Sequence, residues 1–237
     1  MLCAVVFAKL GYEHINWLIA YLILGAEGYF TLILATFFFL AYAEHLATGT
    51  SVIKPSKEEI KRQYPTQKER TLATIRSPTF LFHFFLIPAN ALVIAGGSKM
   101  AGVKPDDSDY DKQIQTAKGL RGAGQAMFVL EVIIVLLTAL YLLFKRNIRV
   151  YMVYACFVAW FPLFIRGIYG ILSVFLQKLN YFDLSNYTAS GISSTFLATE
   201  YILGTTMEYI AALCLISTYF IRNPHKRKEA ENVEAAQ

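Results

Sequence analysis

Residues 150–177 read VYMVYACFVAWFPLFIRGIYGILSVFLQ, an almost wholly apolar and aromatic run with one arginine, Arg166, near its middle. At about 1.5 Å per residue, a helix of this length can cross the roughly 30 Å hydrocarbon layer of a bilayer. A guanidinium at bilayer depth costs on the order of 2.5–3.5 kcal/mol on insertion scales unless it has a partner. The stretch therefore predicts a membrane-spanning helix inside a bundle with a charged interior.

Further apolar runs of roughly 18 or more residues accompany this one, so we predict an all-α, polytopic transmembrane bundle. Composition agrees, because 56% of the 237 residues are hydrophobic and only 16% are charged, whereas soluble domains are nearer one quarter charged. We assign residues 1–222 to the transmembrane domain. The charged, apolar-poor residues 223–237 are predicted to be a disordered cytosolic tail. The five predicted spans are 16–43, 79–97, 124–144, 150–177 and 196–221.

Loop charges predict the orientation, because Lys and Arg are retained on the cytoplasmic side of a membrane. The loop after the first span, the turn after the third and the tail together hold 14 basic residues, against 7 in the segments of the other side. This bias predicts a multi-pass protein of the plasma membrane or an endomembrane, with its N-terminus outside or lumenal and its C-terminus cytosolic. Asn186 begins an N-x-T sequon on the predicted outer side and is a glycosylation candidate, although chance matches to so short a motif are common.

Charged residues recur at one depth in four of the predicted spans. Counted from the predicted outer boundaries, four of them lie about 12–18 Å deep, near the centre of an apolar layer about 30 Å thick. Glu200 is shallower, at about 6 Å. The four deep residues are Glu27, Glu131, Arg166 and Glu208.

The fourth and fifth spans are antiparallel neighbours joined by a short loop, so Arg166 and Glu208 can meet directly. An arginine–carboxylate pair at that depth is strongly favoured over either charge alone. Glu200, Gly204 and Glu208 repeat every four residues and so share one helical face. Gly204 is predicted to leave a notch where the fourth span approaches closely.

Pro162 and Gly167 lie on either side of Arg166 in the same span. A proline cannot donate to the carbonyl of Val158, so we predict a hinge or an opening for water here, with Gly204 taking part from the fifth span. Two interpretations of the buried charges stay open. They line a cavity that binds or moves a small amphipathic or lipid-like molecule, or they only fix helix packing in a receptor-like or structural membrane protein.

No catalytic or metal-binding pattern is apparent in the sequence. The four histidines are dispersed without metal-ligand spacing, and no G-x-S-x-G, H-E-x-x-H or P-loop motif occurs. Basic residues lie in short loops without the aromatic interleaving of nucleic-acid-binding surfaces. We therefore predict no enzyme activity, cofactor, metal or nucleic-acid partner, and membrane lipids as the partners; the oligomeric state is left open.

The glycine-rich stretch KGLRGAG, residues 118–124, precedes the third predicted span. It follows no predicted strand and matches no phosphate-binding loop. We predict that it forms a flexible lead-in to the span, with Arg121 at the level of the lipid head groups.

Three motifs, LRGAGQAMF (120–128), PLFIRGIYGILSVF (162–175) and MEYIAAL (207–213), resemble the pattern of an uncharacterised multi-pass membrane family of filamentous fungi, a domain of unknown function. IAGG (94–97) is similar to the start of that family's second loop. The resemblance covers roughly residues 70–221. The family typically looks seven-spanning, which implies that an N-terminal pair of spans is absent or reduced here. A more distant likeness is to the fungal lipid-translocating exporter group, which also has arginine and glutamate in its later spans.

Overall fold

The computed structural model describes residues 15–103, 108–188 and 191–234, which form an all-helical bundle with one short hairpin. Five helices are long and apolar enough to cross a membrane, so the prediction of an all-α bundle with five spans is confirmed. Four of them agree with the predicted bounds to within five residues, whereas the third begins at Tyr110 rather than at residue 124. The spans are Ile19–Thr48, Pro78–Gly102, Tyr110–Lys145, Tyr151–Phe175 and Ser194–Phe220.

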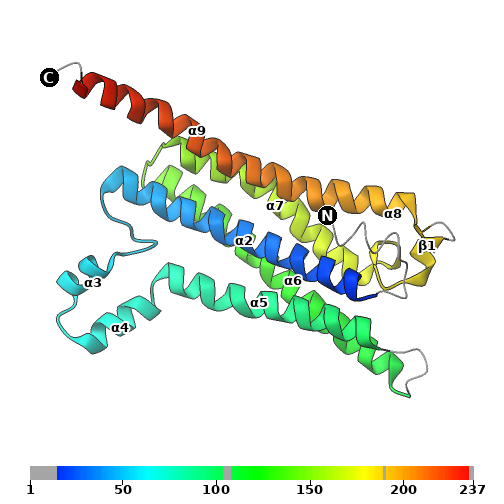
Figure 1. Cartoon of the computed structure of the whole chain (residues 1–237). Coiled ribbons are helices and arrows are strands. Elements are labelled where there is room, and N and C mark those ends of the chain that lie inside the picture. The colour runs from blue at the N-terminus through cyan, green and yellow to red at the C-terminus, as the bar shows by residue number, and fades with distance from the viewer. Residues whose placement is uncertain (1–14, 104–107, 189–190, 235–237) are drawn as a thin grey trace.

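The long helices run back and forth along one direction (Figure 1). They are α2 (Ile15–Thr48), α5 (Pro78–Gly102), α6 (Tyr110–Leu140), α7 (Tyr151–Phe175) and α9 (Thr206–Glu234). A π-helical turn, Tyr141–Lys145, extends α6, while α8 (Ser194–Thr199) and a second π-helical turn, Glu200–Thr205, precede α9. Helix α5 packs chiefly on α6, α6 lies between α5 and α7, α7 contacts both α6 and α9, and α2 contacts all four.

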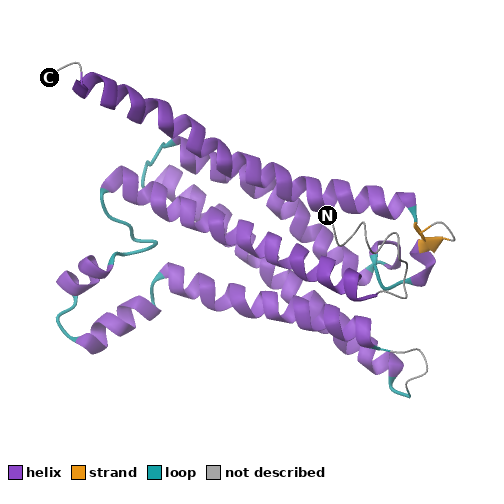
Figure 2. Cartoon of the chain, viewed as in Figure 1, coloured by secondary structure: helices purple, strands orange, loops and turns teal. Residues whose placement is uncertain are grey.

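The two ends of the bundle differ in their connections (Figure 2). At the hairpin end, α7 is followed by two 3₁₀ turns, Gln177–Leu179 and Leu184–Asn186, and by the antiparallel strands β1 (Tyr187–Thr188) and β2 (Gly191–Ile192). At the opposite end, the loop after α2 folds into α3 (Lys57–Gln63) and α4 (Gln67–Ile75). Helix α3 begins with a capping box, in which Ser56 and Glu59 satisfy each other's backbone N–H groups.

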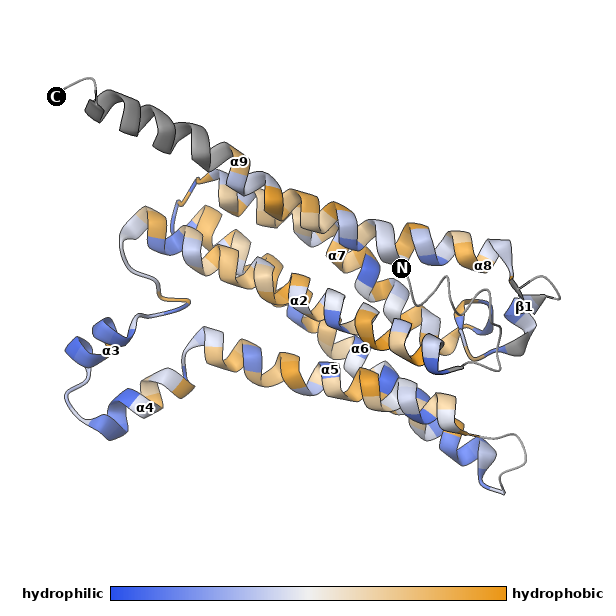
Figure 3. Cartoon of the chain, viewed as in Figure 1, coloured by the Kyte–Doolittle hydropathy of each residue, from blue (hydrophilic) through white to orange (hydrophobic). Residues whose placement is uncertain are grey.

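Apolar side chains fill the bundle and also cover its outside. Phe37 of α2 stacks on Phe82 of α5 with ring centroids 4.0 Å apart, and Leu163 of α7 is fully buried. On the outside, Leu130 and Phe161 are both 59% exposed. Hydrophobic colour follows the long helices, while α3 and α4 are largely hydrophilic (Figure 3). Helices that are apolar on both faces suit a bilayer, where no water surrounds the bundle.

Glycines bring α5 and α6 unusually close together. A Cβ atom at Gly96 would lie 2.6 Å from the backbone nitrogen of Arg121, and one at Gly124 would lie 2.6 Å from the carbonyl oxygen of Ala89. The prediction of a flexible lead-in at residues 118–124 was wrong, because the stretch lies inside α6. Its glycines permit close helix contact, and that packing offsets their low helix propensity.

Helix α9 continues to Glu234, whereas we predicted disorder from residue 223. Residues 223–234 are rich in Lys, Arg, Glu and Ala, which are favourable helix formers. A helix can therefore continue beyond the apolar segment through local propensity. Residues 235–237 lie outside the described part of the chain.

Candidate functional site

Arg166 of α7 and Glu208 of α9 form an ion pair inside the bundle. The Arg166 Nε donates a hydrogen bond to Glu208 Oε1 over 2.7 Å, and the side chains are only 13% and 21% exposed. The guanidinium carbon also lies 5.1 Å from the ring centroid of Tyr29 and 6.0 Å from that of Tyr169. The aromatic rings add cation–π attraction to the guanidinium. The ion pair is made through one hydrogen bond from Nε and is not bidentate.

Glu200 is held by two tyrosines rather than by an arginine. It is 8% exposed, and Tyr21 of α2 donates to its Oε1 over 3.0 Å while Tyr169 donates to its Oε2. Glu200 begins the second π-helical turn, a distortion that widens a helix and re-aims its side chains. A Cβ at Gly204 would lie 3.2 Å from Glu200 Oε1 and 3.6 Å from the Tyr169 ring, so the predicted notch accommodates the carboxylate as well as α7.

A second arginine, Arg121 of α6, belongs to the same cluster. It is 6% exposed, and its Nη2 donates to Ser173 Oγ of α7 over 3.1 Å. We predicted Arg121 in a flexible lead-in at head-group level, whereas α6 begins at Tyr110 and so holds this residue inside the helix, where it is buried against α7. A usable signal was the seven-residue spacing of the small residues Ala117 and Gly124, which marks a helix contact face around Arg121.

Among the described residues, this polar cluster borders two cavities. The first has a volume of about 50 Å³, lies among α2, α5, α6 and α7, and is lined in part by Arg121, Ser173 and Tyr181. The second has a volume of about 210 Å³ and lies between α2 and the segment from Glu200 into α9. Arg166 and Glu200 line both cavities. Burial raises the pKa of the Tyr181 phenol, in the hairpin-end loop, well above its ordinary value, so it enters the first cavity as a neutral group.

The other predicted carboxylates lie apart from the arginines. Glu27 of α2 accepts a hydrogen bond from Asn90 Nδ2 of α5 over 2.6 Å. Glu131 of α6 is 2% exposed, and its Oε2 has no hydrogen-bond partner among the described residues. Neither forms an ion pair with Arg166 in the described part of the chain. The convergence of four charges at one depth therefore resolves into one ion pair and two separate carboxyl groups.

The predicted hinge residues serve packing in this structure. Helix α7 continues through Pro162, which is buried. A Cβ at Gly167 would lie 2.6 Å from the hydroxyl oxygen of Tyr29, and this hydroxyl donates to the carbonyl of Leu163 over 2.8 Å. Gly167 therefore lets Tyr29 of α2 reach the α7 backbone, where its ring centroid lies 5.1 Å from the guanidinium carbon of Arg166.

Asn186 holds the hairpin-end loop together. Its side chain is buried at 8% exposure, and its amide nitrogen donates to the carbonyl oxygens of Gln177 and Asn180 over 2.7 and 2.9 Å. A side-chain amide has two N–H groups, so both are used. An N-linked glycan would need this nitrogen, and the folded loop therefore disfavours the predicted glycosylation.

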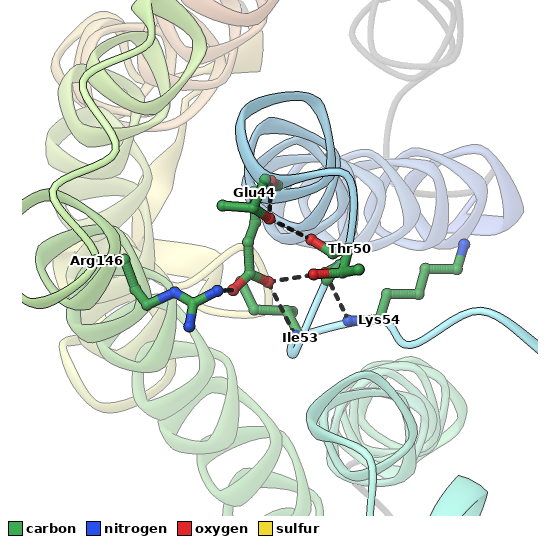
Figure 4. Close-up of polar contacts among 7 residues, drawn as sticks. Glu44, Thr50, Ile53, Lys54 and Arg146 are labelled. Carbon is green, nitrogen blue, oxygen red and sulfur yellow. Dashed lines mark hydrogen bonds and ion pairs between the residues drawn. The ribbon is translucent and has the colours of Figure 1, made fainter. Parts of the chain in front are cut away.

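The structure also shows a buried carboxylate at the opposite end that the sequence pattern did not single out (Figure 4). Glu44 of α2 is fully buried, and its Oε2 accepts hydrogen bonds from Ser51 Oγ over 2.8 Å and from the Ile53 backbone N–H over 3.1 Å. Arg146, just after α6, places Nη2 3.5 Å from Glu44 Oε1. Glu44 thus ties the loop before α3 to the turn between α6 and α7.

We expect Glu44→Gln to lower the free energy of unfolding by about 1–2 kcal/mol, because it weakens two buried hydrogen bonds to a charged acceptor. Arg146→Gln should cost less than about 1 kcal/mol, since this side chain is 32% exposed and its contact is longer. Unfolding of the purified protein in mixed micelles measures both values. Equal losses for the two variants would contradict this ranking.

Comparisons with protein families, with curated proteins and with solved structures find no match to this chain. Among the described residues, no three His, Cys, Asp or Glu side chains are grouped so that they could hold a metal ion. The chemistry of the polar cluster and its two cavities is therefore the basis for a functional proposal.

Proposed function

We propose that this multi-pass membrane protein binds a small amphipathic molecule, with the polar head in the 210 Å³ cavity and the apolar tail in the bilayer. The observation that carries the proposal is that charged and apolar side chains line the same cavity. Arg166, Glu200 and Glu208 line its interior, and Leu24 and Leu22 line it beside them. Leu24 is 61% exposed on the outside of α2, so the cavity adjoins the lipid-facing surface.

The volume of the cavity limits what enters it. Pockets that enclose drug-sized ligands have volumes of about 300–1,000 Å³, whereas this cavity has about 210 Å³. It accommodates a head group and excludes a complete lipid. The tail must then remain beside Leu24, in contact with the membrane.

The charges favour a cationic head group. Two carboxyl groups and one guanidinium line the cavity, and the guanidinium is already bonded to Glu208 Oε1. Glu208 Oε2 takes no part in that bond and faces α2, where a Cβ at Gly28 would lie 3.5 Å away. An ammonium group can bind this oxygen and lie against the ring of Tyr21.

We expect a long-chain alkylamine to raise the unfolding temperature of the protein in nanodiscs, while the alkyl alcohol and alkyl phosphate of the same chain length do not. Glu208→Gln should raise the amine concentration that gives half of this stabilisation about tenfold or more, because it removes a charged acceptor. Asp111→Asn, at an exposed position of α6, is the matched control and should leave the effect unchanged. Equal shifts with all three amphiphiles would show non-specific partitioning and contradict the proposal.

A structural role is the second candidate, and the burial of the Arg166–Glu208 pair favours it. Under that role, Glu208→Gln and Glu200→Gln lower stability, and the three amphiphiles act alike on every variant. Movement of the bound molecule across the membrane is the further activity to measure in sealed vesicles once binding is found.

We further propose membership of the fungal multi-pass family that the three motifs resemble. What supports it is the position of the motifs, since each contributes to the polar cluster. Residues 120–128 hold Arg121, residues 162–175 hold Arg166 and Tyr169, and residues 207–213 hold Glu208. An alignment of family sequences that varied freely at these four positions would contradict the proposal.

A further inference from the structure

We propose a second site, for a small monovalent anion of about the size of chloride, built by Arg121 and Gln125 around the 50 Å³ cavity. This site lies in the first cavity, which shares Arg166 and Glu200 with the cavity of the proposed amphiphile site, but its proposal does not depend on that site. It accounts for two polar groups that the amphiphile site does not use.

Among the described residues, no carboxylate oxygen lies within ion-pair distance of the buried Arg121 guanidinium. The Arg121 side chain donates from Nη2 to Ser173, but Nη1 has no hydrogen-bond partner in the described part of the chain. Neither of the ion pairs found among the described residues includes Arg121. A buried guanidinium with a free N–H group is strongly unfavourable unless an acceptor meets it.

The nearby carboxylates are already engaged. Glu200 lines the same cavity, but both of its oxygens accept hydrogen bonds from Tyr21 and Tyr169. Glu208 pairs with Arg166. Neither carboxylate reaches the guanidinium, so the Arg121 Nη1 has no acceptor among the described residues, and an acceptor held in the cavity would supply one.

Gln125, one turn further along α6, supplies a second group. It is 5% exposed, lines the cavity, and its Oε1 has no hydrogen-bond partner among the residues described. Oxygen and nitrogen of a side-chain amide exchange places by a simple turn, so the same position can present an N–H donor. Gly170 of α7 makes the room, because a Cβ there would collide with the Gln125 amide.

The cavity size selects the occupant. A water molecule needs about 10–15 Å³ of such space, and the cavity offers about 50 Å³. One chloride with a few waters fits, whereas a phosphate ester or a lipid head group does not. Ser173 cannot add a donor, since its hydroxyl donates to the carbonyl of Gly170 over 2.8 Å.

The test compares the unfolding temperature of the nanodisc-embedded protein in sodium chloride, bromide and gluconate at equal ionic strength. We expect chloride and bromide to raise it by about 3 °C over gluconate, as for a ligand that binds only the folded state. Arg121→Gln should abolish the difference. Lys112→Gln, an exposed position of α6 with the same loss of charge, should retain it.

Two measurements keep the proposal testable if Arg121→Gln does not fold. Gln125→Leu retains the arginine and should raise the chloride concentration of half-maximal stabilisation about tenfold, because one hydrogen bond to a charged group is lost. A structure determined in bromide should show anomalous density within hydrogen-bond reach of Arg121 Nη1. Identical unfolding temperatures in all three salts, or density for water alone in this cavity, would overturn the proposal.

Discussion

We expect Arg166→Leu and Glu208→Leu each to lower the free energy of unfolding by about 3–5 kcal/mol, because each leaves its partner charged, buried and unpaired. The pair joins α7 to α9 through a 2.7 Å hydrogen bond. The double variant should recover much of the loss, since it leaves no orphan charge. Unfolding in mixed micelles gives the coupling free energy from the four proteins of the double-mutant cycle.

Glu27→Leu is the matched control for this cycle. Glu27 is also a carboxylate of a membrane-spanning helix, but it accepts its hydrogen bond from Asn90. Its substitution should therefore add to that of Arg166 without coupling. A double variant of Arg166 and Glu208 as unstable as the sum of the single variants would exclude a functional unit made of these two side chains.

The second large effect is expected at the contact between α5 and α6. Gly96→Ala and Gly124→Ala should each lower the free energy of unfolding by about 3 kcal/mol, at the upper end for overpacking. The added Cβ atoms would meet backbone atoms of the facing helix at 2.6 Å, and backbone atoms cannot rotate away as a side chain can. The gain of about 1 kcal/mol in helix propensity offsets only part of the strain.

Neighbouring glycines of the same helices provide the controls. Gly97 of α5 and Gly119 of α6 have nothing within 4 Å of an added Cβ. Gly97→Ala and Gly119→Ala should leave stability unchanged or raise it by up to about 1 kcal/mol. If all four substitutions had equal effects, the close approach of the two helices would not be what these glycines provide.

The amino-acid sequence by itself determined the number of membrane spans. A run of apolar residues long enough to cross a bilayer is a property of consecutive residues, so hydropathy identified all five helices. The predicted bounds differ most from the observed ones where polar residues lie inside the bundle, as in the first half of α6. Arg166 and Glu208 were also named from the sequence, because a short connection makes α7 and α9 antiparallel neighbours and places both residues at a similar depth.

Only the tertiary structure decided which side chains meet the charges. Tyr21 and its acceptor Glu200 are 179 positions apart in the chain, and the π-helical turn that aims Glu200 has no local sequence signature. Arg121 and Glu44 were missed for a related reason. In a helix that is apolar on both faces, hydropathy does not show which face turns inward, since lipid and protein interior are equally apolar. The rotation of each helix about its axis is set by close contacts such as Gly96 on Arg121 and Gly167 on Tyr29, and these contacts exist only once the helices pack.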